Sequence, residues 1–556
     1  MQFSGRAALC LIVLLGATGA FKSCGKEATS GGEDPPRTAN DILELTAAGA
    51  TSVAVLANDQ NLTNEPLTLT IDEAPVVGTA SFNTDRTVRL DLPAGFRGVT
   101  RFKYKITNSK GGFSISSAVV FVDVPAYRVV FAAGSSTQPL ELFVSDLITS
   151  VKISQAVSGN LRLQNAWRSS TGSLIAYERA DPAQVASTAE LFFVRTSPIA
   201  TPVRVQQPSG RRFVDSTRVA ISQDGRWIAF AATPTSGIGQ PAGLFVFDTS
   251  SSGAPVAVGL SANPLTDLTQ WGEAQTALYF MSAPGTISGA AVFRATTGNL
   301  DSPERVSPTY PSGDTHTRLM VSPDETKLVL LGTHAGQNGA FLVDPDNPGL
   351  ERRLTTDMPA GAVIESFQLN EDFTELTYLW RLGNVSNARL SVVAVAAGAV
   401  PRTVLDADIA AFNELRPDGA AALVTRGAGG PSSDGSLFEV SLDRSTSDSR
   451  IAANVSGGVY DDAGDRVFLF SRTLAPAVIE RSEFDRGVAP LVRANTPALA
   501  LFVTPSSAPS AAIIEDPTSG LVLVNAAAPG KTIKLTTLDV GAVPSTLFPD
   551  AIAASP

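Results

Sequence analysis

Cysteine and histidine are scarce in this chain of 556 residues, which contains two of each. The cysteines are Cys10 and Cys24, and the histidines are His316 and His334. Zinc centres are usually built from clusters of these two residue types, so we expect no metal centre of that kind. A serine hydrolase needs a histidine base beside its nucleophile, and the G-x-S-x-G motif is missing. Phosphate-binding glycine loops are missing as well.

Basic side chains are outnumbered, with 42 Lys and Arg against 53 Asp and Glu, a net charge of −11 and a sequence pI near 4.9. Nucleic acids and anionic lipid surfaces are bound through basic patches, so we expect neither as a partner. The same acidity would also keep an exported protein soluble without serving any partner. Beyond the N-terminus, no stretch approaches the roughly 18 apolar residues that mark a membrane-spanning helix.

Residues 1–24 have the pattern of an export signal, with an apolar segment at 7–20 after a positive charge. Cys24 follows this segment, and its placement resembles the bacterial lipoprotein signal. The resemblance implies that Cys24 is acylated and anchors the chain, and Gly25 after it implies the outer membrane. Cleavage after Ala20 is the alternative, and it would leave Cys24 as a free thiol.

Two segments precede the main part of the chain. Residues 25–40 are small, polar and rich in glycine and proline, which predicts a flexible tether. Residues 41–124 alternate apolar and polar side chains in several short runs separated by turn residues. That pattern within fewer than about 90 residues predicts a small β-sandwich.

The runs VLANDQNLTNEPLTLT, GTASFNTDRTVRLDLPAGFRGVTRFKYKITNSKGG and AVVFVDV occur in this order within the predicted sandwich. They resemble the cadherin-like, immunoglobulin-type modules of bacterial surface proteins. Many of these modules hold calcium in an acidic loop after an Asn-Asp pair, which implies calcium candidates at Asp59, Asn61 and Glu65. Calcium usually takes several carboxylates, so a plain turn between strands is the alternative.

A strand-turn-strand signature recurs nine times in the rest of the chain, at intervals of 44 to 53 residues. Examples are SQDGRWIAF from Ser222 and SPDETKLVL from Ser322. Repeats of this length mark stacked units that cannot fold singly. The turns are centred near Pro125, Thr171, Asp224, Glu273, Asp324, Asp372, Asp418, Asp462 and Ser507.

Each unit reads as four antiparallel strands, which predicts a propeller blade. No segment sustains the apolar stripe of a helix, so we expect an all-β chain. The S-P/Q-D-G/E turns followed by L-F-V-x-D strands resemble TolB-like (WD40-like) propeller repeats of bacterial envelope proteins. We expect one β-propeller over residues 125–556, with eight four-stranded blades preferred and nine as the alternative. The first unit lacks its leading strand, which residues 545–553 are expected to supply.

Three sets of residues are functional candidates. The aspartates of the repeated turns are expected to accept backbone hydrogen bonds and fix each turn. The four tryptophans are expected to pack between blades, with a glycan platform as the alternative. His316 and His334 are expected to be neighbours at a blade edge, where they are either a site or a surface pair without a role.

We therefore expect a non-enzymatic lipoprotein of the bacterial cell envelope that serves as a binding scaffold for a protein or glycan partner. The loops at 233–243, 332–339 and 427–435 are the first candidates for binding. A calcium-dependent adhesive or structural surface protein and a propeller lyase or hydrolase are the alternatives. No cofactor is expected apart from the calcium considered above.

Overall fold

The computed structural model describes most of the chain between residues 35 and 554. The described residues are 35–63, 65–123, 128–135, 138–155, 161–169, 172–181, 183, 189–196, 198–213, 219–235, 242–251, 253–259, 264–273, 276–282, 290–383, 388–427, 435–460, 464–470, 477–480, 484, 491–492, 501–503, 511–516, 520–525, 532–534 and 553–554. These residues form strands and turns without a helix, as the sequence predicts. Accordingly, the described part contains no helix long and apolar enough to cross a membrane.

The N-terminal module is a sandwich of two sheets, with strand orders β1-β7-β6-β3 and β2-β5-β4. Strands β1 and β7 pair in parallel, and the other pairs are antiparallel. The strands are β1 (Asp41–Leu45), β2 (Ala50–Val53), β3 (Thr68–Glu73), β4 (Thr79–Phe82), β5 (Val88–Asp91), β6 (Gly98–Thr107) and β7 (Phe113–Val122).

Alternation along β6 builds the core of this module, as the sequence predicts. Phe102, Tyr104 and Ile106 are fully buried, whereas the residues between them are partly exposed. Residues 35–40, which we expected in the tether, contact the module: Arg37 forms a β-bridge with Gln60. The folded module therefore begins nearer residue 35 than residue 41.

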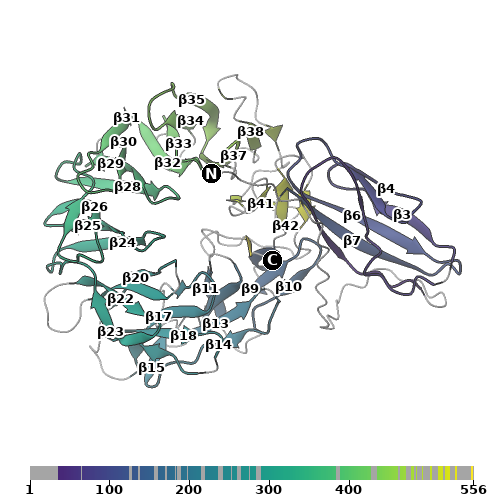
Figure 1. Cartoon of the computed structure of the whole chain (residues 1–556), viewed down its shortest axis with the longest axis horizontal. Helices are drawn as coiled ribbons and strands as arrows, with labels where there is room; N and C mark the ends of the chain where they lie inside the picture. Colours follow the sequence, from purple (N-terminus) through teal and green to yellow (C-terminus); the bar gives the residue numbers. More distant parts are fainter. Residues whose placement is uncertain are drawn as a thin grey trace, which may run out of the picture.

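The rest of the described chain forms a β-propeller, and Figure 1 shows its sheets arranged in a ring with β20, β24, β28 and β32 nearest the centre. We number the sheets as blades in chain order. The strands of blades 1 to 3 are β8 (Arg128–Ser135), β9 (Gln138–Ser145), β10 (Ser150–Lys152) and β44 (Ala553–Ala554); β11 (Arg162–Arg168), β12 (Leu174–Ala180), β13 (Glu190–Arg195) and β14 (Val203–Arg204); and β15 (Arg211–Phe213), β16 (Ala220–Ile221), β17 (Trp227–Pro234), β18 (Gly243–Asp248) and β19 (Val256–Ala257).

Blades 4 to 9 each have four strands in sequence order. They are β20 (Pro264–Trp271), β21 (Ala277–Ser282), β22 (Ala291–Thr296) and β23 (Asn299–Arg305); β24 (Thr315–Val321), β25 (Leu328–His334), β26 (Gln337–Val343) and β27 (Glu351–Arg353); β28 (Ala362–Leu369), β29 (Glu375–Leu382), β30 (Ala388–Ala394) and β31 (Arg402–Ala407); β32 (Ile409–Leu415), β33 (Ala421–Arg426), β34 (Gly435–Ser441) and β35 (Ser449–Val455); β36 (Gly457–Tyr460), β37 (Arg466–Phe470), β38 (Ala477–Glu480) and β39 (Leu491–Val492); and β40 (Leu501–Val503), β41 (Ala511–Asp516), β42 (Gly520–Asn525) and β43 (Thr532–Lys534).

Within the described residues the propeller has nine blades, so the preferred count of eight was wrong and the alternative holds. Blade 1 is completed by the C-terminal strand β44, which pairs with β8 as Ala553 opposite Val129. This strand overlaps the end of the segment 545–553 that we expected to close the ring. The first unit, for which the sequence showed no leading strand, is therefore a blade of four strands, and blade 9 also has four strands.

Neighbouring blades bury each other's faces through the alternation of their second strands. In β12, Leu174 and Ala176 pack against blade 3, whereas Ile175 and Tyr177 pack against blade 1. Equivalent clusters join the successive blades from 3 to 8. A strand that is buried on both faces cannot be stable in an isolated blade, which explains why the repeats occur as a ring.

The repeated turns are fixed as expected. Asp224 Oδ1 accepts hydrogen bonds from Arg226 N (2.9 Å) and Ser222 Oγ (2.6 Å), and Asp324 does the same with Thr326 N and Ser322 Oγ. Asp418 accepts from Ala420 N at 2.9 Å. In blade 6, Asn370 takes this role through Oδ1, rather than Asp372. Asp462 lies outside the described residues.

The module and the ring meet at blade 1. Arg101 of β6 donates from Nη1 to the carbonyl oxygen of Leu147, at 2.9 Å, and Leu147 lies in the turn between β9 and β10. Figure 1 shows the module at the side of the ring. The chain therefore enters the ring and ends within the same part of the molecule.

Deleting residues 551–556 would test the closure of the ring, because this deletion removes β44 and leaves the edge of β8 unpaired. We expect a loss of about 1–3 kcal/mol of propeller stability from the missing backbone hydrogen bonds, measured by thermal or urea unfolding. Deleting only residues 555–556 is the matched control and should have no effect. Equal stability of the two truncated chains would contradict closure by β44.

Candidate functional site

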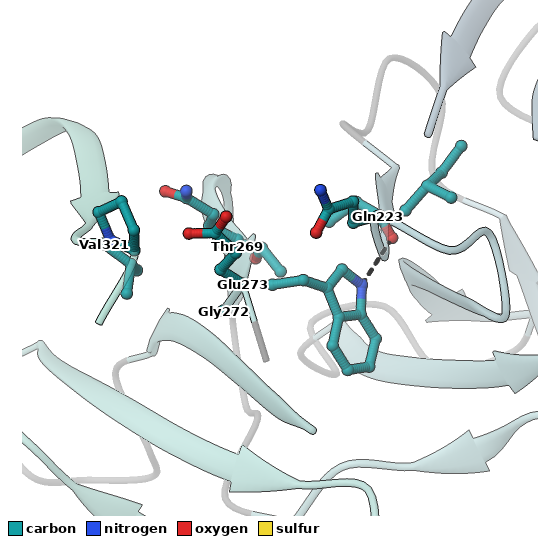
Figure 2. A pocket seen from close by; sticks show the side chains of 10 residues that line it. Gln223, Thr269, Gly272, Glu273 and Val321 are labelled. Atoms are coloured by element: carbon teal, nitrogen blue, oxygen red, sulfur yellow. Dashed lines mark hydrogen bonds between the residues drawn. The ribbon is translucent and has the colours of Figure 1, made fainter. Parts of the chain in front are cut away.

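A pocket of about 480 Å³ opens where the innermost strands of blades 3, 4 and 5 end. It lies at β16, β20 and β24 and at the turns that follow them. Figure 2 shows Gln223 on one side of the opening and Val321 on the other, with Thr269, Gly272 and Glu273 between them. The remaining lining residues are Ala220, Ile221, Gln270, Trp271 and Pro323. The volume lies within the range of ordinary ligand sites, roughly 300–1,000 Å³.

The repeated turn positions these side chains. Gln223 and Pro323 directly precede the turn aspartates of blades 3 and 5, and Glu273 occupies the equivalent turn of blade 4. The aspartates themselves are occupied by backbone hydrogen bonds, so the variable residue beside each one faces the pocket. Because the turns of successive blades lie on one face of the ring, residues about 50 positions apart in sequence converge.

Several polar atoms in the pocket wall lack partners within the described structure. Thr269 Oγ1 is buried without a hydrogen bond, and no hydrogen bond between described residues engages the side-chain amide of Gln270. In blades 6 and 7 the residue at the position of Gln270 links to the next blade: Gln368 Oε1 accepts from Leu415 N at 2.9 Å, and Glu414 Oε2 accepts from Tyr460 N at 2.7 Å. Between blades 4 and 5 this link is not made, which leaves Gln270 facing the pocket.

Trp271 forms the floor of the pocket. Its Nε1 donates to Ala220 O at 3.0 Å, shown as a dashed line in Figure 2, and its ring stacks on Trp227 at a centroid distance of 6.4 Å. It therefore packs between blades 3 and 4, as expected for the tryptophans. Trp167 and Trp380 also belong to clusters between blades.

The two histidines form a second cluster, in blade 5. His316 lies at the start of β24 and His334 at the end of β25, and their Nε2 atoms are 2.7 Å apart. His334 Nδ1 is 2.7 Å from Glu351 Oε1 at the start of β27. Rings of Tyr310 and Phe341 flank His334 at centroid distances of 4.6 and 3.7 Å. The expected neighbourhood of the histidines is confirmed.

Charge determines the tautomers in this cluster. A carboxylate only accepts hydrogen bonds, so His334 donates from Nδ1 to Glu351. In the neutral tautomer that results, its Nε2 accepts a hydrogen bond from Nε2–H of His316. Burial, followed by the neighbouring His334, lowers the pKa of His316 to about 4. His316 is therefore neutral near pH 7. Burial and the carboxylate of Glu351 raise the pKa of Tyr310.

The glycine opposite His316 sets the geometry of the pair. Gly332 pairs with His316 across β24 and β25, and a Cβ on Gly332 would lie 2.0 Å from the carbonyl oxygen of Thr315. Backbone atoms cannot move aside as a side-chain end can. The histidines are thus brought together by a close approach of strands that only glycine permits.

Replacing Gly332 by alanine should destabilise the chain by about 1–3 kcal/mol, the usual cost of overpacking, and should separate His316 from His334. Gly349→Ala is the matched control, because a Cβ there meets nothing within 4 Å. Unfolding by urea would measure both variants. Equal stability of the two variants would show that the strands tolerate the extra carbon.

The three calcium candidates are each engaged by protein groups in the structure. Asp59 Oδ1 accepts from Ala39 N at 2.7 Å, Asn61 Nδ2 donates to Pro35 O at 2.7 Å, and Glu65 forms an ion pair with Arg86 at 2.6 Å. Asp59 also receives the hydroxyl of Tyr104. Each candidate is engaged by a different partner, so the loop is held by protein contacts. The described residues contain no group of three or more His, Cys, Asp or Glu that could hold a metal.

Asp41, which is buried, and Asp59, which is partly buried, form an acidic pair around Tyr104. The Tyr104 hydroxyl lies 3.0 Å from Asp41 Oδ2 and 3.2 Å from Asp59 Oδ2. Burial raises the pKa of Asp41 to about 7 and that of Asp59 to about 6, although the hydrogen bonds from Tyr104 act in the opposite direction. Both acids thus hold a proton more tightly in the folded module than in the unfolded chain.

Stability of the module should fall as the pH rises, because protons bound by the folded state are released on unfolding. The contribution of Asp41 and Asp59 is fully present near pH 4 and is lost as the pH rises through about 6 and 7. Hydrogen-exchange protection of the β6 amides, corrected for intrinsic rates, should drop about tenfold or more from pH 5 to pH 8. Asp41→Asn should flatten this dependence, and protection that rises with pH in the wild type would contradict the assignment.

Several expected positions lie outside the described residues, namely Cys24, residues 236–241 of the first loop and residues 428–434 of the third. The second, 332–339, is a tight hairpin rather than a long binding loop, since β25 ends at His334 and β26 begins at Gln337. Sequence reasoning missed the pocket because it treated the repeated turns as purely structural. The residue directly before each turn aspartate differs from blade to blade, and this variation was the sequence signal for the pocket.

Comparison with known proteins supports both parts of the fold. Residues 33–122 match a family model described as Bacterial Ig domain. The match confirms the immunoglobulin-like module and covers residues 35–40, which contact it. No curated protein matches the chain.

Solved structures with similar folds share little sequence with this chain. A eukaryotic initiation factor is 13% identical, with a TM-score of 0.50, over 73% of this chain and 95% of its own. A prolyl endopeptidase is 12% identical with a TM-score of 0.39, over 68% of this chain and 55% of its own, so this chain spans about half of that protein. TolB from Acinetobacter baumannii is 13% identical with a TM-score of 0.31, over 68% of this chain and 96% of its own. At these identities the likeness concerns the fold alone.

Proposed function

We propose that this chain is a non-enzymatic binding scaffold of the bacterial cell envelope and that it holds a protein or glycan partner in the pocket of blades 3 to 5. The observation that carries the proposal is the convergence of Gln223, Gln270 and Glu273 from successive blades on one opening. The ring holds these side chains on rigid strands and tight turns. A partner would therefore meet a preformed surface.

The chemistry of the pocket favours a neutral or basic partner rich in hydrogen-bonding groups. The lining contains two amide side chains, a hydroxyl and one carboxylate, and it contains no lysine or arginine. An anionic ligand would find no positive charge there. Apolar surface from Ile221, Val321 and Pro323 completes a mixed wall, which suits a sugar ring or a short polypeptide segment.

A binding role also accounts for the single ionisable group in the pocket. Glu273 is the one titratable side chain among the lining residues. Hydrolysis and elimination commonly use at least two groups, one to take a proton and one to give it. The lining thus supports recognition better than acid–base chemistry.

Location in the envelope rests on two features. The N-terminal module matches a domain family of bacterial proteins, and the segment before it resembles a lipoprotein signal with acylation at Cys24. A lipid-anchored ring would present its pocket near the membrane surface, to partners in the periplasm or outside the cell.

Affinity capture from detergent-solubilised envelopes, together with binding to a glycan array, would test the proposal. The double variant Gln223→Ala, Glu273→Ala should lose the partner that the wild-type chain retains, with at least about a tenfold drop for two lost hydrogen-bonding groups. Glu371→Ala is the matched control, because Glu371 directly precedes the turn aspartate of blade 6, away from the pocket. Equal retention by the double variant would place binding elsewhere.

A further inference from the structure

We propose that His316 and His334 together bind a divalent transition-metal ion through their Nε2 atoms. The site is independent of the pocket of blades 3 to 5. Zn²⁺, Ni²⁺ and Cu²⁺ form the class that fits, since imidazole nitrogen is a preferred ligand of these ions. The chain contains two histidines in 556 residues, and the fold brings them into contact.

The two rings already bring their Nε2 atoms together, at the distance of a hydrogen bond. The two Nε2 atoms face each other at 2.7 Å. Two nitrogens that bind one ion at about 2.0–2.1 Å are separated by roughly 2.9–3.4 Å. An ion can enter once the imidazoles part by a few tenths of an ångström, His316 turns, and the proton on its Nε2 moves to Nδ1, so that both Nε2 lone pairs meet the ion. His316 is partly exposed, which allows this small movement and gives the ion access.

A second layer of contacts orients the buried histidine. His334 is 7% exposed, and Glu351 Oε1 holds its Nδ1 at 2.7 Å. This carboxylate–histidine arrangement fixes the tautomer whose Nε2 is unprotonated and makes the ring a better ligand. Phe341 stacks on the same ring at 3.7 Å and 19°, which limits its rotation. The orientation of His334 is thus set before any ion arrives.

Two buried polar groups lie beside the pair. The Tyr310 hydroxyl and Glu351 Oε2 are both buried, and Tyr310 interacts with the Glu351 carboxylate. Tyr310 is 3% exposed, and its ring contacts both histidines at 4.4 and 4.6 Å. With two protein ligands, a bound ion keeps open coordination positions that water would fill. The site is therefore open rather than a closed structural centre.

Selective ¹⁵N labelling of histidine in the full chain, purified with a tag free of histidine, gives a direct test by NMR. Every histidine signal then comes from this cluster. Titration with Zn²⁺ should shift the Nε2 resonances of both residues together and saturate at one ion per chain, whereas Mg²⁺, which prefers oxygen ligands, should leave them unchanged. Absence of a shift at a tenfold excess of Zn²⁺ would overturn the proposal and leave a hydrogen-bonded pair.

Variants separate the ligands from their surroundings. His316→Gln should abolish the Zn²⁺-dependent shift of His334, and Glu351→Gln should weaken Zn²⁺ binding by about 10–100-fold. Glu304→Gln is the matched control, because its carboxylate is exposed and pairs with Arg294 in blade 4. A response of His334 that survives in His316→Gln would overturn the shared site. Equal weakening of Zn²⁺ binding by Glu304→Gln and Glu351→Gln would also overturn the proposal, because the effect would then follow from net charge and not from the contact of Glu351 with His334.

Discussion

Burial of each blade by its two neighbours is the constraint on which the rest of the structure depends. The second strand of each central blade is covered on both faces: all seven side chains of β12 are buried, as are all six of β21. Fully burying a large apolar side chain contributes about 1.5–3 kcal/mol, so each interface between blades is a substantial part of the stability of the ring. A blade without a neighbour would expose one of these faces. Closure of blade 1 by β44 therefore helps to keep the apolar faces of the blades away from water around the ring, although β44 itself has only two residues.

Much of the architecture could be predicted because it follows from local patterns repeated many times. The run WIAFAA after Asp224 must be a buried strand, and the Ser222–Asp224 turn before it satisfies its own backbone groups. Blade number was harder to predict. It depends on whether the first unit finds a leading strand, and the partner of β8 comes from more than 400 residues further along the chain. No local pattern encodes such a pairing.

The candidate sites were less predictable, for a different reason. The contact of His316 and His334 followed from the spacing of two antiparallel strands, but Glu351 joins them from β27 and Tyr310 from the preceding connection. The Asn-Asp pair, in contrast, suggested a calcium loop, whereas in the structure Asn61 and Glu65 are engaged by Pro35 and Arg86. Residue type alone indicates possible ligands. Their convergence depends on which neighbours compete for them.

The pocket illustrates how a repeated scaffold acquires a local site. Links between adjacent innermost strands are made by Gln368 to blade 7 and by Glu414 to blade 8. The second of these buries a carboxylate, and burial raises the pKa of Glu414 to about 7. Gln270 holds the same position in blade 4 but makes no such link. Val321 in blade 5 holds the position of the donors Leu415 and Tyr460, and both Gln270 and Val321 line the pocket. The link is not general, since Ala220 and Met320 stand at this position in blades 3 and 5, and the apolar interface between blades 4 and 5 remains without it. A hydrogen bond contributes only about 0.5–1.5 kcal/mol net, so the omission costs little stability and frees an amide for a partner. Burial between blades thus determines the fold, and the weaker polar links between them are where this chain can vary toward function.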